Sequence, residues 1–246
     1  MTLEFVPVEE VSRICALVIG DYGMGKTCLA RTALGQEWQN DQWVQVEEPE
    51  GKVLILAAEP GLLSVRDLMQ AGHIEAVKIT TWEQMREAYM WLNSDQKARE
   101  TYTWVMIDSL TEIADQCEKA AKQKHPNSSD SFKMWGDYSE TITDRVKEFR
   151  DLPYYNVIFT CLPSVDKDEN NRRFIGPDIV GKKIKQRLPS YFDEVFYLRE
   201  FSADDGKTYR AIQTVKWEQF PGKDRSGKLA PIEEPNLLKI ARKILG

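Results

Sequence analysis

Short apolar runs alternate with longer amphipathic segments through the first two thirds of the chain. The runs cover residues 13–19, 53–58, 76–79, 104–108 and 156–162. They are largely continuous rather than alternately apolar and polar, which is typical of strands buried on both faces of a parallel sheet. The sequence therefore predicts a series of core strands in this region.

The segments between these runs carry apolar residues at helical spacing. In residues 82–93 they are Trp82, Met85, Tyr89 and Leu92, three or four positions apart. Helices are expected at 27–34, 61–70, 82–93, 111–123 and 135–152, a surface excursion at 36–51 and an exposed loop at 124–131. This alternation predicts an α/β fold with a mostly parallel sheet and helices on both faces.

The last third of the chain has a different character. Residues 163–191 are polar and basic with little periodicity, whereas 192–201 and 209–217 have the composition of strands. Asp204-Asp205-Gly206 between those strands is a hairpin signal, so an antiparallel extension of the sheet is expected, followed by a helix at 236–245. We expect a single domain over 1–246: a lead-in at 1–12, the basic segment at 163–191, and the hairpin and helix within 192–246.

Composition narrows the class of protein. The 246 residues are 42% hydrophobic and 29% charged, which is enough apolar material for a folded core. The formal net charge is −6, so the whole surface does not suit a polyanion, and any contact with nucleic acid must come from a local basic patch.

The cysteines and the hydropathy indicate the compartment. Cys15, Cys28, Cys117 and Cys161 are far apart without a C-x-x-C pair, which favours reduced structural thiols. No apolar run approaches the roughly 18 residues of a membrane span, and the N-terminus lacks a secretion signal. A cytoplasmic protein without a membrane partner is expected.

The first strand leads into a glycine-rich turn that predicts a phosphate-binding loop. The turn fits G-x-x-x-x-G-K-[ST], with a strand before it and a helix after it, as that mechanism requires. Glycines let backbone N–H groups surround a phosphate, the lysine reaches the β- and γ-phosphates, and the threonine hydroxyl can ligate Mg²⁺. The predicted nucleotide contacts are Gly20, Asp21, Tyr22, Gly23, Met24, Gly25, Lys26, Thr27 and Cys28.

Hydrolysis of a bound triphosphate also needs carboxylates. Asp108 ends the strand at 104–108, at the edge where open α/β sheets bind ligands, and is the candidate to hold the metal with Thr27. The alternative is that Asp108 caps the following helix. Because Ser109 follows it, a base must come from another strand; Glu59 fits, and Glu112 is a weaker rival.

These motifs together resemble a known family. They are the loop at 20–27, Ala57-Ala58-Glu59-Pro60-Gly61, Asp108-Ser109-Leu110-Thr111 and Lys223-Asp224-Arg225-Ser226-Gly227-Lys228. Over residues 13–230 the chain resembles phage-encoded RecA-like P-loop ATPases of the single-strand annealing and recombination group, often described as AAA-type nucleotide-binding proteins.

The resemblance implies roles for particular residues. Glu59 is implied as the catalytic base, although the usual surroundings are Asp-Thr-Glu-Gly and not Ala-Ala-Glu-Pro. Thr160, near the end of the strand at 156–162, is the nearest match to the residue that senses the γ-phosphate. Lys223 and Arg225 match positions that reach the nucleotide of a neighbouring subunit, with isolated surface charges as the alternative.

The segment from 172 to 187 carries six basic residues against one acidic residue. We expect a mobile loop leading into a basic helix, and the resemblance implies that this loop lies on the path of single-stranded DNA. A solvated charged face is the alternative. The candidate DNA contacts are Arg172, Arg173, Lys182, Lys183, Lys185 and Arg187.

The expected function is therefore ATP binding and hydrolysis with Mg²⁺, DNA-stimulated, coupled to annealing or recombination of single-stranded DNA. Lys26, Asp108 and Glu59 are the expected catalytic residues. The resemblance also implies a homo-oligomer, as a ring or filament, a single-stranded-DNA-binding protein as a further partner, and a bacterial host cytoplasm. Two alternatives stay open: a nucleotide-switched annealing module with negligible hydrolysis, and a P-loop phosphotransferase.

Overall fold

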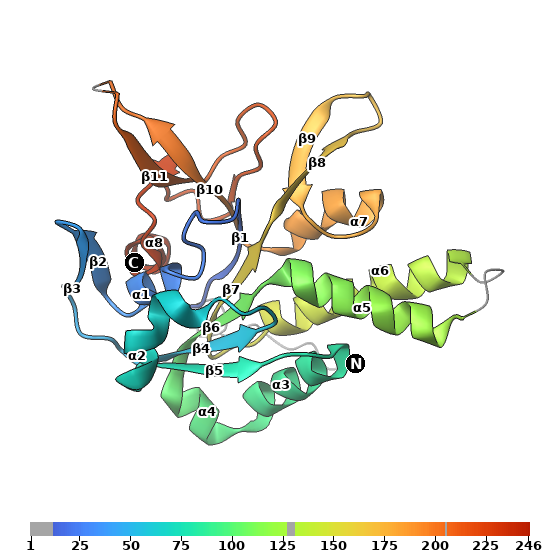
Figure 1. Cartoon of the computed structure of the whole chain (residues 1–246), viewed down its shortest axis with the longest axis horizontal. Helices are drawn as coiled ribbons and strands as arrows, with labels where there is room; N and C mark the ends of the chain where they lie inside the picture. The colour runs from blue at the N-terminus through green and yellow to red at the C-terminus, as the bar shows by residue number, and fades with distance from the viewer. Residues whose placement is uncertain (1–11, 127–130, 205) are drawn as a thin grey trace, which may run out of the picture.

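A mixed β-sheet forms the centre of the chain (Figure 1). The computed structural model describes residues 12–126, 131–204 and 206–246. Most of the expected lead-in, residues 127–130 of the expected loop and Asp205 of the expected turn lie outside the described residues.

The main sheet has the strand order β13-β11-β10-β1-β7-β6-β4-β5, with β12 also paired to β10. Its strands are β1 (Cys15–Gly20), β4 (Lys52–Ala57), β5 (Ile74–Lys78), β6 (Tyr102–Asp108), β7 (Asn156–Cys161), β10 (Glu194–Ser202), β11 (Thr208–Gln213), β12 (Lys223–Asp224) and β13 (Ile232–Glu233). Neighbours from β5 to β10 are parallel, and β11, β12 and β13 are antiparallel to their partners. The predicted sheet and its antiparallel C-terminal extension are confirmed.

Helices cover both faces of the sheet, as predicted. They are α1 (Leu29–Ala33), α2 (Arg66–Gln70), α3 (Trp82–Ser94), α4 (Gln96–Thr101), α5 (Leu110–Lys124), α6 (Ser131–Arg150), α7 (Lys182–Arg187) and α8 (Leu237–Leu245), with 3₁₀ helices η2 (Leu62–Val65) and η4 (Leu188–Tyr191). Alternate residues of β1 face opposite sides: Leu17 packs in the cluster that includes α3, α5 and α6, whereas Val18 packs with α1, α2 and α8. The α/β class is therefore confirmed.

The helix after the phosphate loop is shorter than predicted. The α-helix proper begins at Leu29 instead of Thr27, because the preceding residues form tighter turns in which Leu29 N–H donates to the Lys26 carbonyl at 3.1 Å. The helix expected at 135–152 is α6 and begins earlier, at Ser131; near its start Trp135 is 38% exposed, whereas Tyr138 is 1% exposed. The first turns of α6 extend with α5 beyond the sheet (Figure 1).

The expected surface excursion at 36–51 contains a hairpin, β2 (Gln36–Gln39) and β3 (Gln42–Gln45). Asn40 and Asp41 connect the strands with φ of 49° and 61°. Two central residues with positive φ define the type I′ turn, whose twist matches that of antiparallel strands. Asn-Asp was the available signal, since these residues tolerate the left-handed region.

The basic segment is also ordered differently from the expectation. It forms the antiparallel hairpin β8 (Pro163–Lys167) and β9 (Arg173–Pro177) before α7, so the prediction of an irregular loop is wrong. Asp168 closes the turn because its Oδ1 accepts N–H bonds from Asn170 and Arg172, both at 2.8 Å. Pro177 is tolerated because it lies at the end of an edge strand, where a missing N–H costs little.

The cysteines are free thiols, as predicted. Cys15, Cys117 and Cys161 are buried, and burial raises the pKa of Cys117 and of Cys161 to about 12. These three thiols therefore serve packing. Among the helices of the described residues, none combines the length and apolar character needed to cross a membrane.

Candidate active site

The phosphate loop joins β1 to α1 at the carboxyl edge of the sheet. Lys26 lies across it: its Nζ donates to the carbonyl oxygens of Gly20 at 2.7 Å and Asp21 at 3.0 Å. Burial lowers the pKa of Lys26, while the negative charges of Asp108 and Glu59 oppose that shift. The lysine that the sequence assigned to phosphate is therefore in the electrostatic field of both predicted carboxylates.

Two glycines of the loop are required for different reasons. Gly25 has φ of +95°, which an L side chain rarely adopts. At Gly20 the constraint is packing, since a Cβ there would lie 2.9 Å from the carbonyl oxygen of Leu198 on β10. The sequence motif predicts the need for an unusual backbone conformation in the loop. The packing constraint at Gly20 could not be predicted from it, because Leu198 lies about 180 residues further along the chain.

Asp108 is held at the loop by hydroxyls from two other elements. Thr27 Oγ1 donates to its Oδ2 at 2.7 Å, and Thr160 Oγ1 on β7 donates to its Oδ1 at 2.5 Å. The carboxylate is buried, with Asp108 only 4% exposed. Ser109 provides the side-chain cap of α5, so the alternative that Asp108 caps this helix is not the observed arrangement.

These oxygens fit a magnesium ion bound together with nucleotide. Mg²⁺ usually takes one or two protein oxygens and completes its octahedron with water and phosphate oxygens. Thr27 and Asp108 supply such a pair, side by side at the mouth of the loop. In the described ranges, no group of three or more His, Cys, Asp or Glu residues could hold a metal.

Glu59 follows β4 at the same edge. Burial raises its pKa, as do the charges of Asp108 and Glu112, while a hydrogen bond from Ser109 and the charge of Lys26 oppose the rise. The backbone also ties the two strand ends together, because Ala58 N–H donates to the Asp108 carbonyl at 2.8 Å. Glu59 thus has the partly desolvated surroundings of a general base.

Ser109 is a positioning residue that sequence reasoning missed. In the sequence it counted only as the absence of a carboxylate next to Asp108. In the structure it is 1% exposed, caps α5 and lies close enough to Glu59, at a different strand end, to lower the pKa of that carboxyl. The cap position, a serine three residues before Glu112, was the available signal.

Thr160, the predicted sensor of the γ-phosphate, is fully buried. Its hydroxyl also contacts the carbonyl oxygen of Ile107 at 3.3 Å, in addition to Asp108. Its observed role is to position the Asp108 carboxylate. A sensing role stays a prediction.

The predicted DNA contacts lie on the β8–β9 hairpin and α7, which rise from the same sheet edge as the phosphate loop (Figure 1). Arg172 and Arg173, at the hairpin turn, are exposed, as are Lys182, Lys183 and Arg187 of α7. Lys185 differs: its side chain is 13% exposed and lies 3.6 Å from Asp166. Its charge is therefore already neutralised within the protein.

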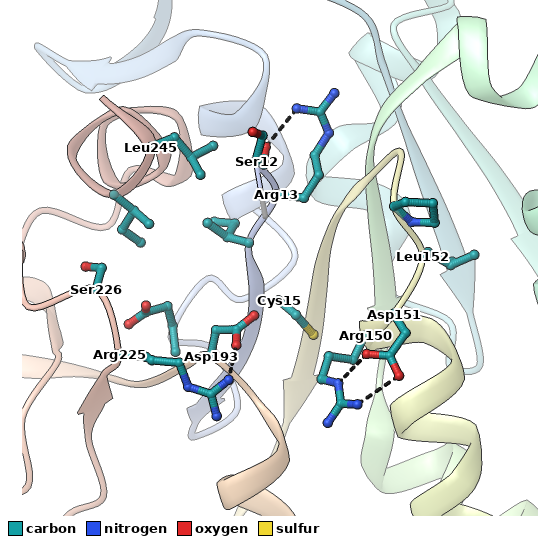
Figure 2. A pocket seen from close by; sticks show the side chains of 14 residues that line it. Ser12, Arg13, Cys15, Arg150, Asp151, Leu152, Asp193, Arg225, Ser226 and Leu245 are labelled. Atoms are coloured by element: carbon teal, nitrogen blue, oxygen red, sulfur yellow. Dashed lines mark hydrogen bonds and ion pairs between the residues drawn. The ribbon is translucent and has the colours of Figure 1, made fainter. Parts of the chain in front are cut away.

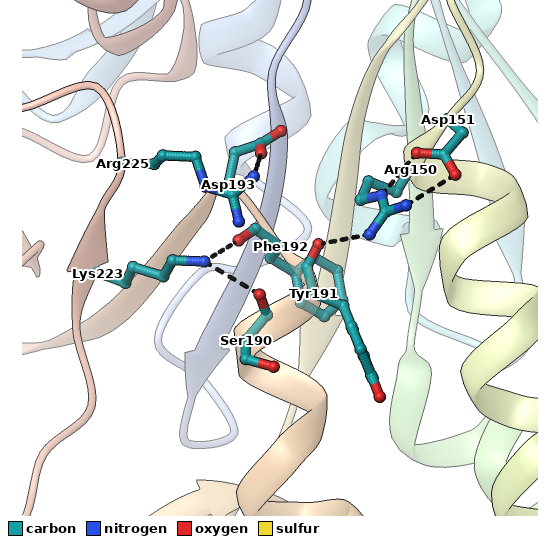
Figure 3. A network of polar contacts seen from close by, with 8 residues as sticks. All are labelled: Arg150, Asp151, Ser190, Tyr191, Phe192, Asp193, Lys223 and Arg225. Carbon is teal, nitrogen blue, oxygen red and sulfur yellow. Dashed lines mark hydrogen bonds and ion pairs between the residues drawn. The ribbon is translucent and has the colours of Figure 1, made fainter.

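The predicted trans-acting residues lie at the opposite edge of the sheet, beside the first residues of β10 (Figure 2). Lys223 Nζ donates to the carbonyl of Ser190 at 3.2 Å and to that of Phe192, and Arg225 pairs with Asp193 at 2.6 Å (Figure 3). They are far from the phosphate loop of their own chain. Action on a neighbour's nucleotide stays a prediction.

A cavity of about 840 Å³ lies at this opposite edge, and the buried Glu194 lines it. Burial and the charge of Asp224 raise the pKa of Glu194 from 4.5 to about 7, and its Oε2 has no hydrogen-bond partner among the described residues. The folded state therefore keeps a proton that the unfolded chain releases above pH 4.5, so the stability linked to this proton is lost as pH rises towards 7.

We expect Glu194→Gln to stabilise the protein above pH 7 by up to about 3 kcal/mol, because the amide carries no buried charge. Near pH 4 the difference should disappear, since the glutamic acid is then neutral in both states. Urea unfolding at pH 4 and pH 8 checks this, with the exposed Glu48→Gln as control. Equal stability of Glu194→Gln and the unchanged protein at pH 8 would contradict it.

Comparison with known proteins places this site in a family. A family described as an AAA domain matches residues 12–226, which is most of the chain. Among curated proteins none matches the sequence. The solved structures that are similar include the flagellar accessory protein FlaH from Methanocaldococcus jannaschii, with a TM-score of 0.46, 10% identity, and coverage of 91% of this chain and 87% of that chain. With its phosphate loop and the paired Thr27 and Asp108, the chain belongs to the AAA domain family and carries a P-loop NTPase domain.

Proposed function

We propose that the protein is a RecA-like ATPase that binds single-stranded DNA and promotes annealing or recombination. The observation that carries the ATPase part is the meeting of Thr27, Asp108 and Glu59 beside the phosphate loop, from three different strand ends. Together the loop can bind a triphosphate, Thr27 and Asp108 can bind a metal ion, and Glu59 can activate water. Such a combination is needed for hydrolysis and not for binding alone.

Each residue has a distinct task in this proposal. Loop amides and Lys26 hold the phosphates, and Thr27 and Asp108 hold Mg²⁺, which neutralises charge on the phosphate oxygens when bound. Thr160 fixes the Asp108 carboxylate, and Ser109 lies beside Glu59. Glu59 accepts a proton from the attacking water as that water adds to the γ-phosphate, the bond from the γ-phosphorus to the bridging oxygen breaks, and ADP leaves with that oxygen.

The DNA part is supported by the position of exposed basic residues on the β8–β9 hairpin and on α7. Arg172, Arg173, Lys182 and Lys183 are exposed at the same edge as the loop, in a protein of net charge −6. Basic side chains on a projecting hairpin and helix can neutralise backbone phosphates without reading sequence. Because these side chains lie at the same sheet edge as the phosphate loop, binding of ATP at the loop could change how they contact DNA.

Replacing Arg172, Arg173, Lys182 and Lys183 together with alanine should weaken binding of single-stranded DNA by at least about tenfold. The slope of log affinity against log salt should also become shallower by about 0.7 for each DNA phosphate that the variant no longer neutralises. Lys185 is left in place because Asp166 already pairs with it. Fluorescence anisotropy of a labelled oligothymidylate at several salt concentrations measures both effects.

A charge-matched control separates a local site from overall charge. It removes the same number of positive charges from the exposed residues Lys78, Lys97, Lys119 and Lys133. We expect this control to retain most of the affinity at equal salt. If both variants lose DNA binding equally, the hairpin and α7 are ordinary charged surface.

The proposed oligomer rests on the location of Lys223 and Arg225. From the edge opposite their own phosphate loop, these side chains could reach a nucleotide only on another subunit. A ring or filament would bring such a site to them.

Phosphate release with and without single-stranded DNA tests the proposed function as a whole. DNA-stimulated release is expected. Annealing that is complete without hydrolysis would support the nucleotide-switched module instead, and transfer of the phosphate to a small acceptor would support the phosphotransferase.

A further inference from the structure

Arg210 on β11 is placed over the phosphate loop by the register of the sheet. Gly20, the last residue of β1, pairs with Leu198 of β10, and Leu198 pairs with Ile212 of β11. The β10–β11 hairpin therefore continues past the end of β1 and projects beyond the loop (Figure 1). Arg210 is two residues from Ile212, on the same face of this hairpin.

That face points towards the side of the sheet that carries α1. Ile212 is fully buried in the cluster that contains Leu29 and Ala30 of α1. One step further towards the loop, the Arg210 side chain reaches the glycine turn itself. A Cβ on Gly25 would lie 3.5 Å from Arg210 Nη1, in ordinary van der Waals contact.

The contacts of Arg210 within the protein do not account for this position. Its ion pair is with Glu200, the cross-strand neighbour, at 3.9 Å, and both side chains are 50% exposed. Such exposed pairs contribute roughly 0–1 kcal/mol. The guanidinium can therefore leave Glu200 at little cost for a stronger anionic partner.

We propose that Arg210 is a phosphate ligand supplied in cis: its guanidinium binds oxygens of the nucleotide held by the loop. The inference rests on the proposed nucleotide binding and adds a residue to that site. A guanidinium presents several N–H donors in a planar fork that matches phosphate oxygens. Lys26 binds the phosphates from inside the loop, and Arg210 closes over them from the projecting hairpin.

The full-length protein carrying Arg210→Ala tests this through affinity for ATP and ADP, measured by calorimetry with Mg²⁺. Loss of charge-assisted hydrogen bonds to phosphate predicts an affinity about ten- to a hundredfold weaker. Arg210→Lys keeps the charge without the fork and should recover part of the affinity. A loss of affinity for ATP alone places Arg210 at the γ-phosphate. An equal loss of affinity for ADP places it at the α- or β-phosphate.

Two controls make the outcome decisive. Arg86→Ala removes an exposed arginine from α3 and should leave both affinities unchanged, and thermal unfolding should show that Arg210→Ala is folded. Unchanged ATP and ADP affinities in a folded Arg210→Ala protein would overturn the proposal. Failure of the unchanged protein to bind nucleotide would instead overturn the proposed function, which separates the two.

Discussion

Replacing Glu59 with glutamine should abolish ATP turnover while ATP binding stays close to that of the unchanged protein. The substitution keeps the size of the side chain and its place beside Ser109, but the amide cannot take a proton from water. Loss of a general base typically lowers the rate by about 100- to 10,000-fold. Phosphate release under saturating ATP measures the rate, and calorimetry measures the affinity.

Glu112→Gln is the matched control, since Glu112 is the other carboxylate near Glu59. It should retain most of the turnover. A glutamine at position 59 that leaves turnover intact, or a larger loss at position 112, would show that the base has been misassigned. The raised pKa of Glu59 adds a second readout: protonation should switch off hydrolysis at a higher pH than for a solvated glutamate, as pH falls.

Lys26→Ala should remove both ATP binding and turnover. The ammonium is placed inside the loop by the carbonyls of Gly20 and Asp21, where phosphate oxygens would meet it. Hydrogen bonds to charged groups contribute about 1.5–3 kcal/mol each, so we expect affinity to fall at least about tenfold. Equilibrium binding of a fluorescent ATP analogue measures the loss.

Lys52→Ala is the control for this substitution, because Lys52 makes a surface ion pair with Glu75 away from the loop. Its affinity for ATP should match that of the unchanged protein. Retention of ATP binding by Lys26→Ala would mean that the nucleotide does not occupy the loop in the proposed way.

The parts of the site that could be predicted from the sequence are those encoded by adjacent residues. The spacing from Gly20 to Thr27 and the apolar runs that end at Ala58 and Asp108 were enough to place loop and carboxylates at one edge, because parallel strands share a carboxyl edge. The structure brings these residues together as expected.

The remaining parts depend on residues distant in sequence. Thr160 reaches Asp108 because β7 lies between β1 and β6, and Ser109 reaches Glu59 because β4 is the neighbour of β6. Arg210 reaches Gly25 only through the register of β10 and β11. No local pattern specifies strand order or register, so these contacts could not be predicted from it.

Turn chemistry explains the missed hairpins. In β2–β3 and β8–β9 the turns are formed by Asn and Asp residues, whereas the hairpin that was predicted has a glycine in its turn. Arg173, the one basic residue of β9, is exposed whereas Ile175 on the same strand is buried, and this mixture gave no clear strand pattern in the sequence.

ATP hydrolysis at the phosphate loop is tested most directly by phosphate release from ATP by the unchanged protein, Lys26→Ala and Glu59→Gln, at equal concentration with Mg²⁺ and single-stranded DNA. We expect measurable turnover for the unchanged protein and background rates for both variants, with ATP still bound by Glu59→Gln but not by Lys26→Ala. A rate for the unchanged protein that is no higher than that of Lys26→Ala would contradict it.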